Sequence, residues 1–281
     1  MKNMTIHQAK SQLIQITDDS QCADMILGHL LKVPRSYLFT HVNLPLTDHQ
    51  ESVLREYMSR LSKNEPIQYI LGYADFMNIR LTVTPDVLIP RSDTETLVLV
   101  ALAAIRKNGY SKILDMCTGS GAIALGILHE LPGKKYNAVC ADISAKALSV
   151  AQRNAQNLYE KRVSFIESDF FSAFDANNDK FDIIVSNPPY IEKGDISELM
   201  PQVRDYEPHL ALDGGLDGLD AYRQLISHAP DYLAEGGTLA FEVGYTQAHR
   251  VADLMSKSFQ NIEIIKDLSG IERVVKGEIA N

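Results

Sequence analysis

From about residue 93 onward, apolar strand-like segments alternate with amphipathic helical segments, and this alternation limits the possible folds more than any other feature. Short runs rich in β-branched residues predict strands at residues 111–116, 137–142, 163–168, 181–186 and 238–243. Apolar residues at helical spacing predict helices at residues 94–109, 121–131, 144–158, 219–233 and 246–258. Strands that alternate with helices in this way form a parallel sheet with helices on both faces. Two final strands, 262–267 and 271–276, are too close together for a helical crossover, so we expect an antiparallel pairing at the sheet edge.

The N-terminal part of the chain has a different pattern and predicts a separate bundle of short helices. The segments "ADMILGHLLKV" and "HQESVLREYMSRLSK" place apolar residues at helical spacing, and three prolines punctuate this part of the chain. A β-like stretch follows, with a possible turn at Asn78, and it predicts a linking β-hairpin. We therefore expect a helical bundle at residues 1–71, a hairpin linker at 72–91 and an α/β domain at 92–281.

Composition and charge disfavour several classes of protein. No apolar run reaches the roughly 18 residues needed to cross a bilayer, and the N-terminus lacks the apolar stretch of a signal peptide, so we expect a cytoplasmic protein without membrane contact. The three cysteines are scattered and the eight histidines show no H-x-H or H-E-x-x-H spacing, so we expect neither a disulfide framework nor a metal site. Residues 1–85 carry as many basic as acidic side chains, and the remainder carries the whole net charge of −9, which weakly disfavours nucleic acid as a partner.

A glycine-containing turn follows the first predicted strand and suggests a site for a nucleotide-type cofactor. Thr118, Gly119, Ser120 and Gly121 connect the strand at 111–116 to the next helix. Glycines let a ligand approach the backbone closely, and ligands of open parallel sheets bind at the carboxyl ends of strands. The turn has no phosphate-loop lysine and only a G-x-G, so an ordinary strand-to-helix turn is the alternative.

Acidic residues at the ends of the next two strands fit the same kind of site. Asp142 ends the second strand, 23 residues after Gly119, where it can accept hydrogen bonds from ribose hydroxyls. A helix N-cap is the alternative, although Ser144 can also fill that role. After the third strand, Asp169 can accept from an adenine amino group and Phe170 can stack on the ring. For these two residues, a capped turn with a core phenylalanine is the alternative.

Acidic residues at the ends of the first two strands, Asp115 and Asp142, the G-x-G turn between them and the sequence N-P-P-Y after the fourth strand together resemble the S-adenosylmethionine-dependent methyltransferases of the seven-stranded, Rossmann-like class. The resemblance implies an α/β fold with strand order 3-2-1-4-5-7-6 and an antiparallel seventh strand. It implies S-adenosylmethionine as the cofactor and S-adenosylhomocysteine as its product. The residues implied to contact the cofactor are Cys117, Thr118, Gly119, Ser120, Gly121, Asp142, Asp169, Phe170 and Asn187.

The N-P-P-Y sequence at residues 187–190 predicts a pocket for a planar –NH₂ group. An amide or exocyclic amine nitrogen is a poor nucleophile because its lone pair is delocalised. Asn187 can offer its side-chain oxygen, and Pro188 a carbonyl fixed in direction by the ring of Pro189, to the two N–H groups of that nitrogen. Tyr190 can pack on the planar group. A strand-ending turn with a surface tyrosine is the alternative, and the motif by itself does not distinguish a nucleic-acid base from an amide.

Seven longer segments resemble the bacterial peptide chain release factor glutamine methyltransferases, the HemK/PrmC family. They are residues 65–76, 87–98, 114–125, 186–191, 206–226, 236–247 and 267–275. The resemblance implies N5-methylation of the glutamine in the Gly-Gly-Gln loop of class 1 release factors. It implies that Asn187, Pro188 and Tyr190 are catalytic and that these residues and Pro189 hold the glutamine.

The resemblance also implies that the N-terminal bundle docks on the release factor, for which a stabilising cap is the alternative. We expect a monomer without direct contact to nucleic acid. The rival enzyme is an N-P-P-Y amine methyltransferase that acts on adenine N6 or guanine N2 of a nucleic acid. The rival without catalysis is a binding protein that keeps the fold.

Three positions depart from the family pattern. Cys117 stands where the loop usually begins with glycine, and its Cβ would strain a left-handed backbone. Ser92 replaces a proline, and Phe170 stands where some relatives have a larger aromatic residue. The glycine-rich segment 213–220 is expected to be a loop rather than a phosphate site. Glu242, at the end of the fifth strand, is open between a structural acceptor and a pocket residue.

Overall fold

The computed structural model describes residues 3–279, which divide into two compact units. The first unit comprises the described residues up to Gly72 together with Met200–Tyr206. The second unit comprises Tyr73–Leu199 and the described residues from Glu207 onward. The chain therefore returns once from the second unit to complete the first.

The first unit is built from short helices whose ends are fixed by polar side chains. Thr5 and Thr47 each form a capping box with the glutamine three residues later, so both of these helices begin at a defined residue. The hydroxyl of Tyr206 donates to the carbonyl of Lys63 at 2.8 Å and joins the returning segment to the bundle. The helices are α1 (Ile6–Thr17), α2 (Ser20–Leu31), α3 (Arg35–Thr40), α4 (Asp48–Leu61), α5 (Ile67–Leu71) and α9 (Pro201–Arg204).

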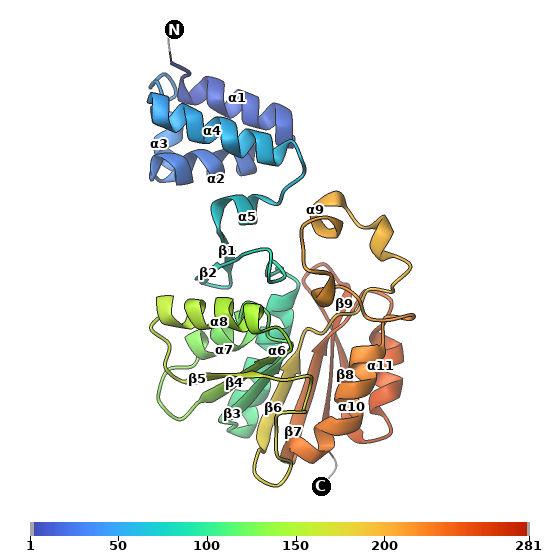
Figure 1. Ribbon diagram of the computed structural model, residues 1–281. Helices are drawn as coiled ribbons and strands as arrows, with labels where there is room; N and C mark the ends of the chain where they lie inside the picture. Colours follow the sequence, from blue (N-terminus) through green and yellow to red (C-terminus); the bar gives the residue numbers. More distant parts are fainter. Residues whose placement is uncertain (1–2, 280–281) are drawn as a thin grey trace. The chain divides into compact units, whose positions relative to one another are not determined.

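A seven-stranded sheet organises the second unit, with the order β5-β4-β3-β6-β7-β9-β8 (Figure 1). Every pairing is parallel except those of β9, which is antiparallel to both β7 and β8. Counted along the sheet's own strands, this is the order 3-2-1-4-5-7-6 with an antiparallel seventh strand, and the predicted fold is confirmed. The strands are β3 (Lys112–Met116), β4 (Asn137–Asp142), β5 (Val163–Glu167), β6 (Phe181–Ser186), β7 (Leu233–Glu242), β8 (Phe259–Lys266) and β9 (Glu272–Ile279).

The start of β7 differs from the expectation by five residues, more than the ends of β8, β9 and α11, which differ by about three. β7 begins at Leu233, whereas the predicted strand began at residue 238. Its pairing with β6 is interrupted by a register shift, and Gly236 has φ +69° inside the extra stretch. The strand thus continues through an irregularity at Gly236 and Gly237. These residues lack the regular alternation of apolar and polar side chains from which a strand is predicted.

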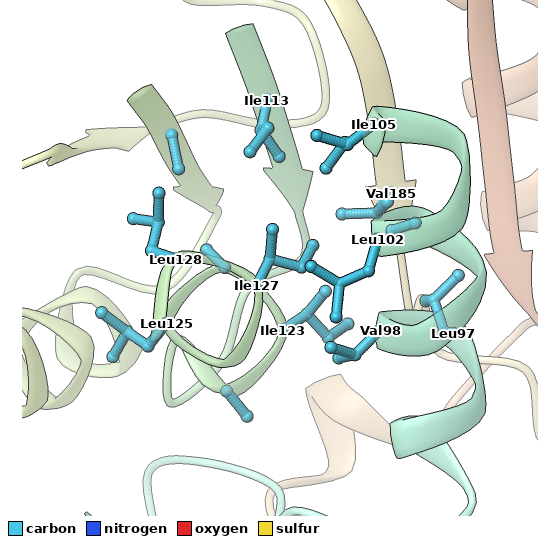
Figure 2. Close-up of a cluster of buried hydrophobic side chains, with 14 of the residues drawn as sticks. Leu97, Val98, Leu102, Ile105, Ile113, Ile123, Leu125, Ile127, Leu128 and Val185 are labelled. Carbon is cyan, nitrogen blue, oxygen red and sulfur yellow. The ribbon is translucent and has the colours of Figure 1, made fainter. Parts of the chain in front are cut away.

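Helices cover both faces of this sheet. The apolar cluster that includes α6 and α7 lies on one face, and the cluster that includes α10 and α11 lies on the other. Figure 2 shows leucine, isoleucine and valine side chains of α6 and α7 meeting Ile113 of β3 and Val185 of β6. The helices are α6 (Thr94–Asn108), α7 (Ala122–Glu130), α8 (Ala145–Asn157), α10 (Asp220–Tyr232) and α11 (Ala248–Met255), with short 3₁₀ turns η1 (Ile196–Glu198) and η2 (His209–Ala211).

A two-stranded hairpin, β1 (Tyr73–Phe76) and β2 (Ile79–Thr82), opens the second unit. The buried side chain of Asn154 on α8 accepts from the Thr82 N–H at 2.7 Å. Its amide group donates to the carbonyls of Thr82 at 3.0 Å and Ser120 at 2.9 Å. One side chain therefore holds the hairpin, α8 and the glycine-containing turn together. Among the described residues no helix is long and apolar enough to span a membrane.

Replacing Leu102 by alanine should lower the free energy of unfolding by about 3 kcal/mol, because it leaves a cavity in the cluster of Figure 2. Leu99 on the same helix is 56% exposed, whereas Leu102 is 2% exposed, so Leu99→Ala is the matched control. The control should change stability by less than about 0.5 kcal/mol in urea unfolding. Equal effects of the two substitutions would contradict the orientation of α6.

Candidate active site

The carboxyl ends of the central strands border a cavity of about 230 Å³ in the second unit. It lies where the strand order reverses, since β4 and β6 pair with opposite edges of β3, and this is the usual ligand position in such sheets. The polar and glycine residues of its lining are Asp86, Arg91, Thr94, Thr118, Gly119, Ser120, Asp142, Ser144, Ser168, Asp169 and Asn187. Cys117, Phe170 and Pro189 also line it, whereas Gly121, Pro188 and Tyr190 are outside the lining.

The turn after β3 has three residues with left-handed backbone, and one of them is not glycine. Cys117 has φ +60°, Gly119 +56° and Gly121 +80°. Cys117 therefore keeps the left-handed conformation of a glycine despite its Cβ, at a cost of roughly 1 kcal/mol. Burial raises the pKa of its thiol, which stays protonated. A Cβ at Gly121 would lie 3.2 Å from the Ala151 Cβ, so this glycine is needed for the packing of the turn.

Asp115, near the end of β3, holds this turn in place through hydrogen bonds to its side chain. One of its oxygens accepts from the Thr118 hydroxyl at 2.7 Å and from the Ala124 N–H at 3.1 Å. Its other oxygen has no hydrogen-bond partner among the described residues. Burial raises the pKa of Asp115 to about 7, although the two hydrogen bonds oppose the shift. The carboxyl group is thus a structural acceptor beneath the cavity.

Asp142, at the end of β4, presents its carboxylate to the cavity. One oxygen accepts from the Gly119 N–H and the other from the Ser144 N–H, each at 2.9 Å. The N-cap of α8 is Ser144, whose hydroxyl oxygen accepts from Ala147, so capping does not account for Asp142. Burial raises the pKa of Asp142, while its backbone donors favour the charged form. Lone pairs on both oxygens are left for a ligand.

The turn after β5 brings the two other predicted residues to the cavity. Asp169 is exposed and Phe170 is half-buried, with φ +46°. The Ser168 hydroxyl donates to the carbonyl of Phe170 and accepts from Ala173, so it holds the turn in shape. Phe170 also packs against the apolar cluster beneath it, so both the functional and the core interpretation of this side chain have a structural basis.

The N-P-P-Y segment follows β6 directly. The Asn187 amide group donates to the Thr94 hydroxyl oxygen at 3.3 Å. Tyr190 lies behind the lining, where its hydroxyl donates to Glu242 at 3.4 Å and its carbonyl accepts from Gln247 at 2.8 Å. Pro188 is buried. The structure therefore places Asn187 and Pro189 at the cavity and fixes Tyr190 beside it.

Glu242, whose role was open between a structural acceptor and a pocket residue, and residues 89–95, "IPRSDTE", make further contacts near the cavity. The contacts of residues 89–95 were not predicted from the sequence. Glu242 is 1% exposed, and burial raises its pKa to about 7 while the Thr94 hydroxyl and the Arg273 charge oppose the shift. It is absent from the cavity lining, so it acts as a structural acceptor. In the segment, Arg91 pairs with buried Glu207, and Asp93 pairs with Arg273 at 3.0 Å. The dense run of polar residues at a helix start was the available signal.

The glycine-rich segment 213–220 packs against the backbone of Tyr190. A Cβ at Gly214 would lie 2.7 Å from the Tyr190 Cα, and one at Gly218 would lie 2.5 Å from the Tyr190 carbonyl oxygen. These glycines are thus explained by close packing. Among the described residues, no group of three or more histidine, cysteine or acidic side chains is arranged to hold a metal ion.

Comparison with protein-family models identifies two matching regions. Residues 5–72 match the PrmC N-terminal domain, and residues 90–216 match the methyltransferase small domain. Among solved structures, a T. thermophilus 16S rRNA N2 G1207 methyltransferase in complex with AdoMet and guanosine has a similar fold, with a TM-score of 0.53 and 17% identity. The match covers 74% of this chain and 49% of that one. Fold and domains define the class: a methyltransferase with a Rossmann-like sheet.

Curated relatives identify the family within this class. The release factor glutamine methyltransferase of Clostridium acetobutylicum is 40% identical over 260 residues, which cover 92% of this chain and 90% of the relative. That of Francisella tularensis is 40% identical over 288 residues and covers 99% of both chains. This chain belongs to the release factor glutamine methyltransferase family, as its motifs predicted.

Replacing Asp115 by asparagine should stabilise the protein more at pH 8 than at pH 5. The pKa of about 7 in the folded state is above the ordinary value, so the stability linked to the bound proton is present below about pH 4 and lost as the pH rises through 7. Asparagine keeps the acceptor for Thr118 and Ala124 and removes the ionisation. The difference in unfolding free energy between variant and wild type should grow by about 2 kcal/mol from pH 5 to pH 8 in urea unfolding. A pH-independent difference would contradict the assigned ionisation.

Proposed function

We propose that this protein transfers a methyl group from S-adenosylmethionine to the side-chain amide nitrogen, N5, of the glutamine in the Gly-Gly-Gln loop of class 1 release factors. The observation that carries the proposal is the side-chain amide of Asn187 in the wall of the same cavity as Gly119 and Asp142, in a member of this family. The product cofactor is S-adenosylhomocysteine.

The residues around the cavity fit this cofactor. A Cβ on Gly119 would meet no atom within 4 Å, so the backbone there borders open space that a ligand can approach. The free lone pairs of Asp142 suit the two hydroxyls of a ribose. Asp169 and Phe170 suit the amino group and the face of an adenine. We assign Cys117, Thr118, Gly119, Ser120, Asp142, Asp169, Phe170 and Asn187 to the cofactor. Gly121, the remaining residue that the resemblance implied, is outside the cavity lining, and we assign it to the packing of the turn.

The N-P-P-Y residues are assigned to the glutamine. When bound, the cofactor supplies a methyl group on an electrophilic sulfonium. The side-chain oxygen of Asn187 and the carbonyl of Pro188 accept from the two N–H groups of the glutamine, which favours a pyramidal nitrogen with a free lone pair. Pro189 fixes the direction of that carbonyl, and Tyr190 packs on the planar amide. Fixed dipoles of this kind replace a strong general base, and the extra proton leaves after transfer.

We assign the first unit, with its helices α1–α5, to docking on the release factor, and we expect a monomer that does not bind nucleic acid directly. Family membership and the equal numbers of basic and acidic side chains in residues 1–85 support this assignment. A nucleic-acid base remains the competing acceptor, because the T. thermophilus relative in fold is named as an rRNA guanine methyltransferase.

Substrate choice is tested by supplying labelled S-adenosylmethionine with a class 1 release factor, the same factor carrying Gly-Gly-Ala, DNA, or ribosomal RNA. Label should appear on the first protein alone, since the alanine variant lacks the amide nitrogen. Label on either nucleic acid, or undiminished label on the Gly-Gly-Ala protein, would overturn the assignment. Absence of transfer to every acceptor would favour a binding protein.

Replacing Asn187 by alanine should lower kcat by roughly 10²–10³-fold, because the glutamine nitrogen loses one of its two acceptors. Asn108, exposed at the far end of α6, gives the matched control Asn108→Ala, which should retain full turnover. Both variants should unfold at the wild-type temperature. Near-normal turnover of the Asn187 variant would remove this residue from the mechanism.

A further inference from the structure

An asparagine acts as a defined acceptor only when its amide is held in one of its two orientations. The oxygen and the NH₂ group of the side chain are similar in size, so packing distinguishes them poorly and hydrogen bonds must decide. The role proposed for Asn187 requires its oxygen to face the glutamine, since its NH₂ group there would oppose another donor. Some neighbour must therefore favour one orientation.

We propose that Thr94 fixes the Asn187 amide so that its oxygen faces the methyl acceptor. Thr94 is thus a positioning residue, and this inference rests on the proposed function. The direct observation is the 3.3 Å hydrogen bond from the Asn187 NH₂ group to the Thr94 oxygen, which occupies the nitrogen of the amide and leaves its oxygen for another partner. Both residues line the cavity.

Thr94 favours this orientation only if its lone pairs, and not its proton, face Asn187. A hydroxyl has one proton and two lone pairs. The Thr94 hydroxyl opposes the rise in the pKa of buried Glu242, as does the charge of Arg273, so we assign this carboxylate as the acceptor that the Thr94 proton faces. The same carboxylate accepts from the Tyr190 hydroxyl at 3.4 Å. Glu242 therefore holds Tyr190 directly through this hydrogen bond.

The backbone around Thr94 is held on both sides, so its hydroxyl has a fixed position. Thr94 is 4% exposed and is the first residue of α6. On the N-terminal side of Thr94, the Arg91 side chain pairs with buried Glu207. The Arg91 carbonyl accepts from the Thr94 N–H at 3.2 Å. Asp93, directly before Thr94, pairs with Arg273. Glu95, directly after Thr94, accepts from the Met77 N–H at 2.7 Å. Residues 89–95, "IPRSDTE", thus hold Thr94 in place beside Asn187, which lies 93 positions after Thr94 in the sequence.

The kinetic test uses two substitutions of Thr94, one that removes the hydroxyl and one that keeps it. Thr94→Val removes the hydroxyl and keeps the shape, so kcat on the release factor should fall roughly 10–100-fold while the Kd of the cofactor changes less than about two-fold. Thr94→Ser keeps the hydroxyl and should restore kcat to within a few-fold of wild type. Thr96→Val, on the same helix but outside the cavity lining, is the matched control.

A double-mutant cycle separates orientation from general support. In the Asn187→Ala background there is no amide to orient, so Thr94→Val should cause no further loss of kcat. Losses that add up in the double variant, a serine variant as slow as the valine variant, or a valine variant as fast as wild type would each overturn the inference.

An NMR measurement separates failure of this inference from failure of the proposed function. In wild-type protein without any substrate, the side-chain NH₂ protons of Asn187 should show nuclear Overhauser contacts to the β and γ protons of Thr94. These contacts should disappear in Asn187→Ala, which assigns the signal. If wild type transfers no methyl group to the release factor, the proposed function fails, but the contacts still report the orientation. If the contacts are absent in wild type, the orientation fails whatever the substrate.

Discussion

The shape of the turn after β3, residues 117–121, depends on one desolvated carboxyl group. A single oxygen of Asp115 connects the end of β3, the turn and the first residues of α7 through Thr118 and Ala124. Burial of this group costs free energy, as its pKa of about 7 indicates, and the two hydrogen bonds recover part of that cost. Asp142 holds Gly119 from the neighbouring strand, and the parallel pairing of Met116 with Ala141 sets the distance between the two supports.

The N-P-P-Y segment is held in a comparable way, but by the N-cap residue of α11 and by the loop before α10. Gln247 donates to the carbonyls of Tyr190 and Gly218, and Ile191 forms an isolated bridge with Asp213. The close approach at Gly214 leaves no room for a side chain. The glycines of the 213–220 segment are therefore needed so that one loop can lie on another, and the position of Asn187 depends on residues that do not reach the cavity.

The sequence predicted what depends on local pattern and missed what depends on distant contacts. The parallel sheet, the antiparallel pairing at its edge and the position of Asp142 at a strand end followed from periodicity and from motifs near the strand ends. The strand order and the assignment of Asn187 to the same site followed from the resemblance to a known family. The bond between Thr94 and Asn187 joins residues 93 positions apart, and neither segment alone indicates the other. The left-handed backbone of Cys117 was also unresolved, because a side chain at φ +60° is tolerated only when the surrounding turn is fixed independently.

N-P-P-Y is likewise a local sequence pattern, and by itself it does not distinguish a nucleic-acid base from an amide. The T. thermophilus rRNA methyltransferase shares the fold at a TM-score of 0.53 and 17% identity, so the fold alone does not identify a methyl acceptor. In this chain, Tyr206 belongs to the helical unit and the next residue, Glu207, holds Arg91 at the cavity wall. The helical unit is thus linked through the chain to Pro208, Leu210 and Ala211 of the cavity lining. Under the proposed function, selection between a base and an amide is expected from these surrounding segments, while Asn187 is expected to serve the chemistry common to both.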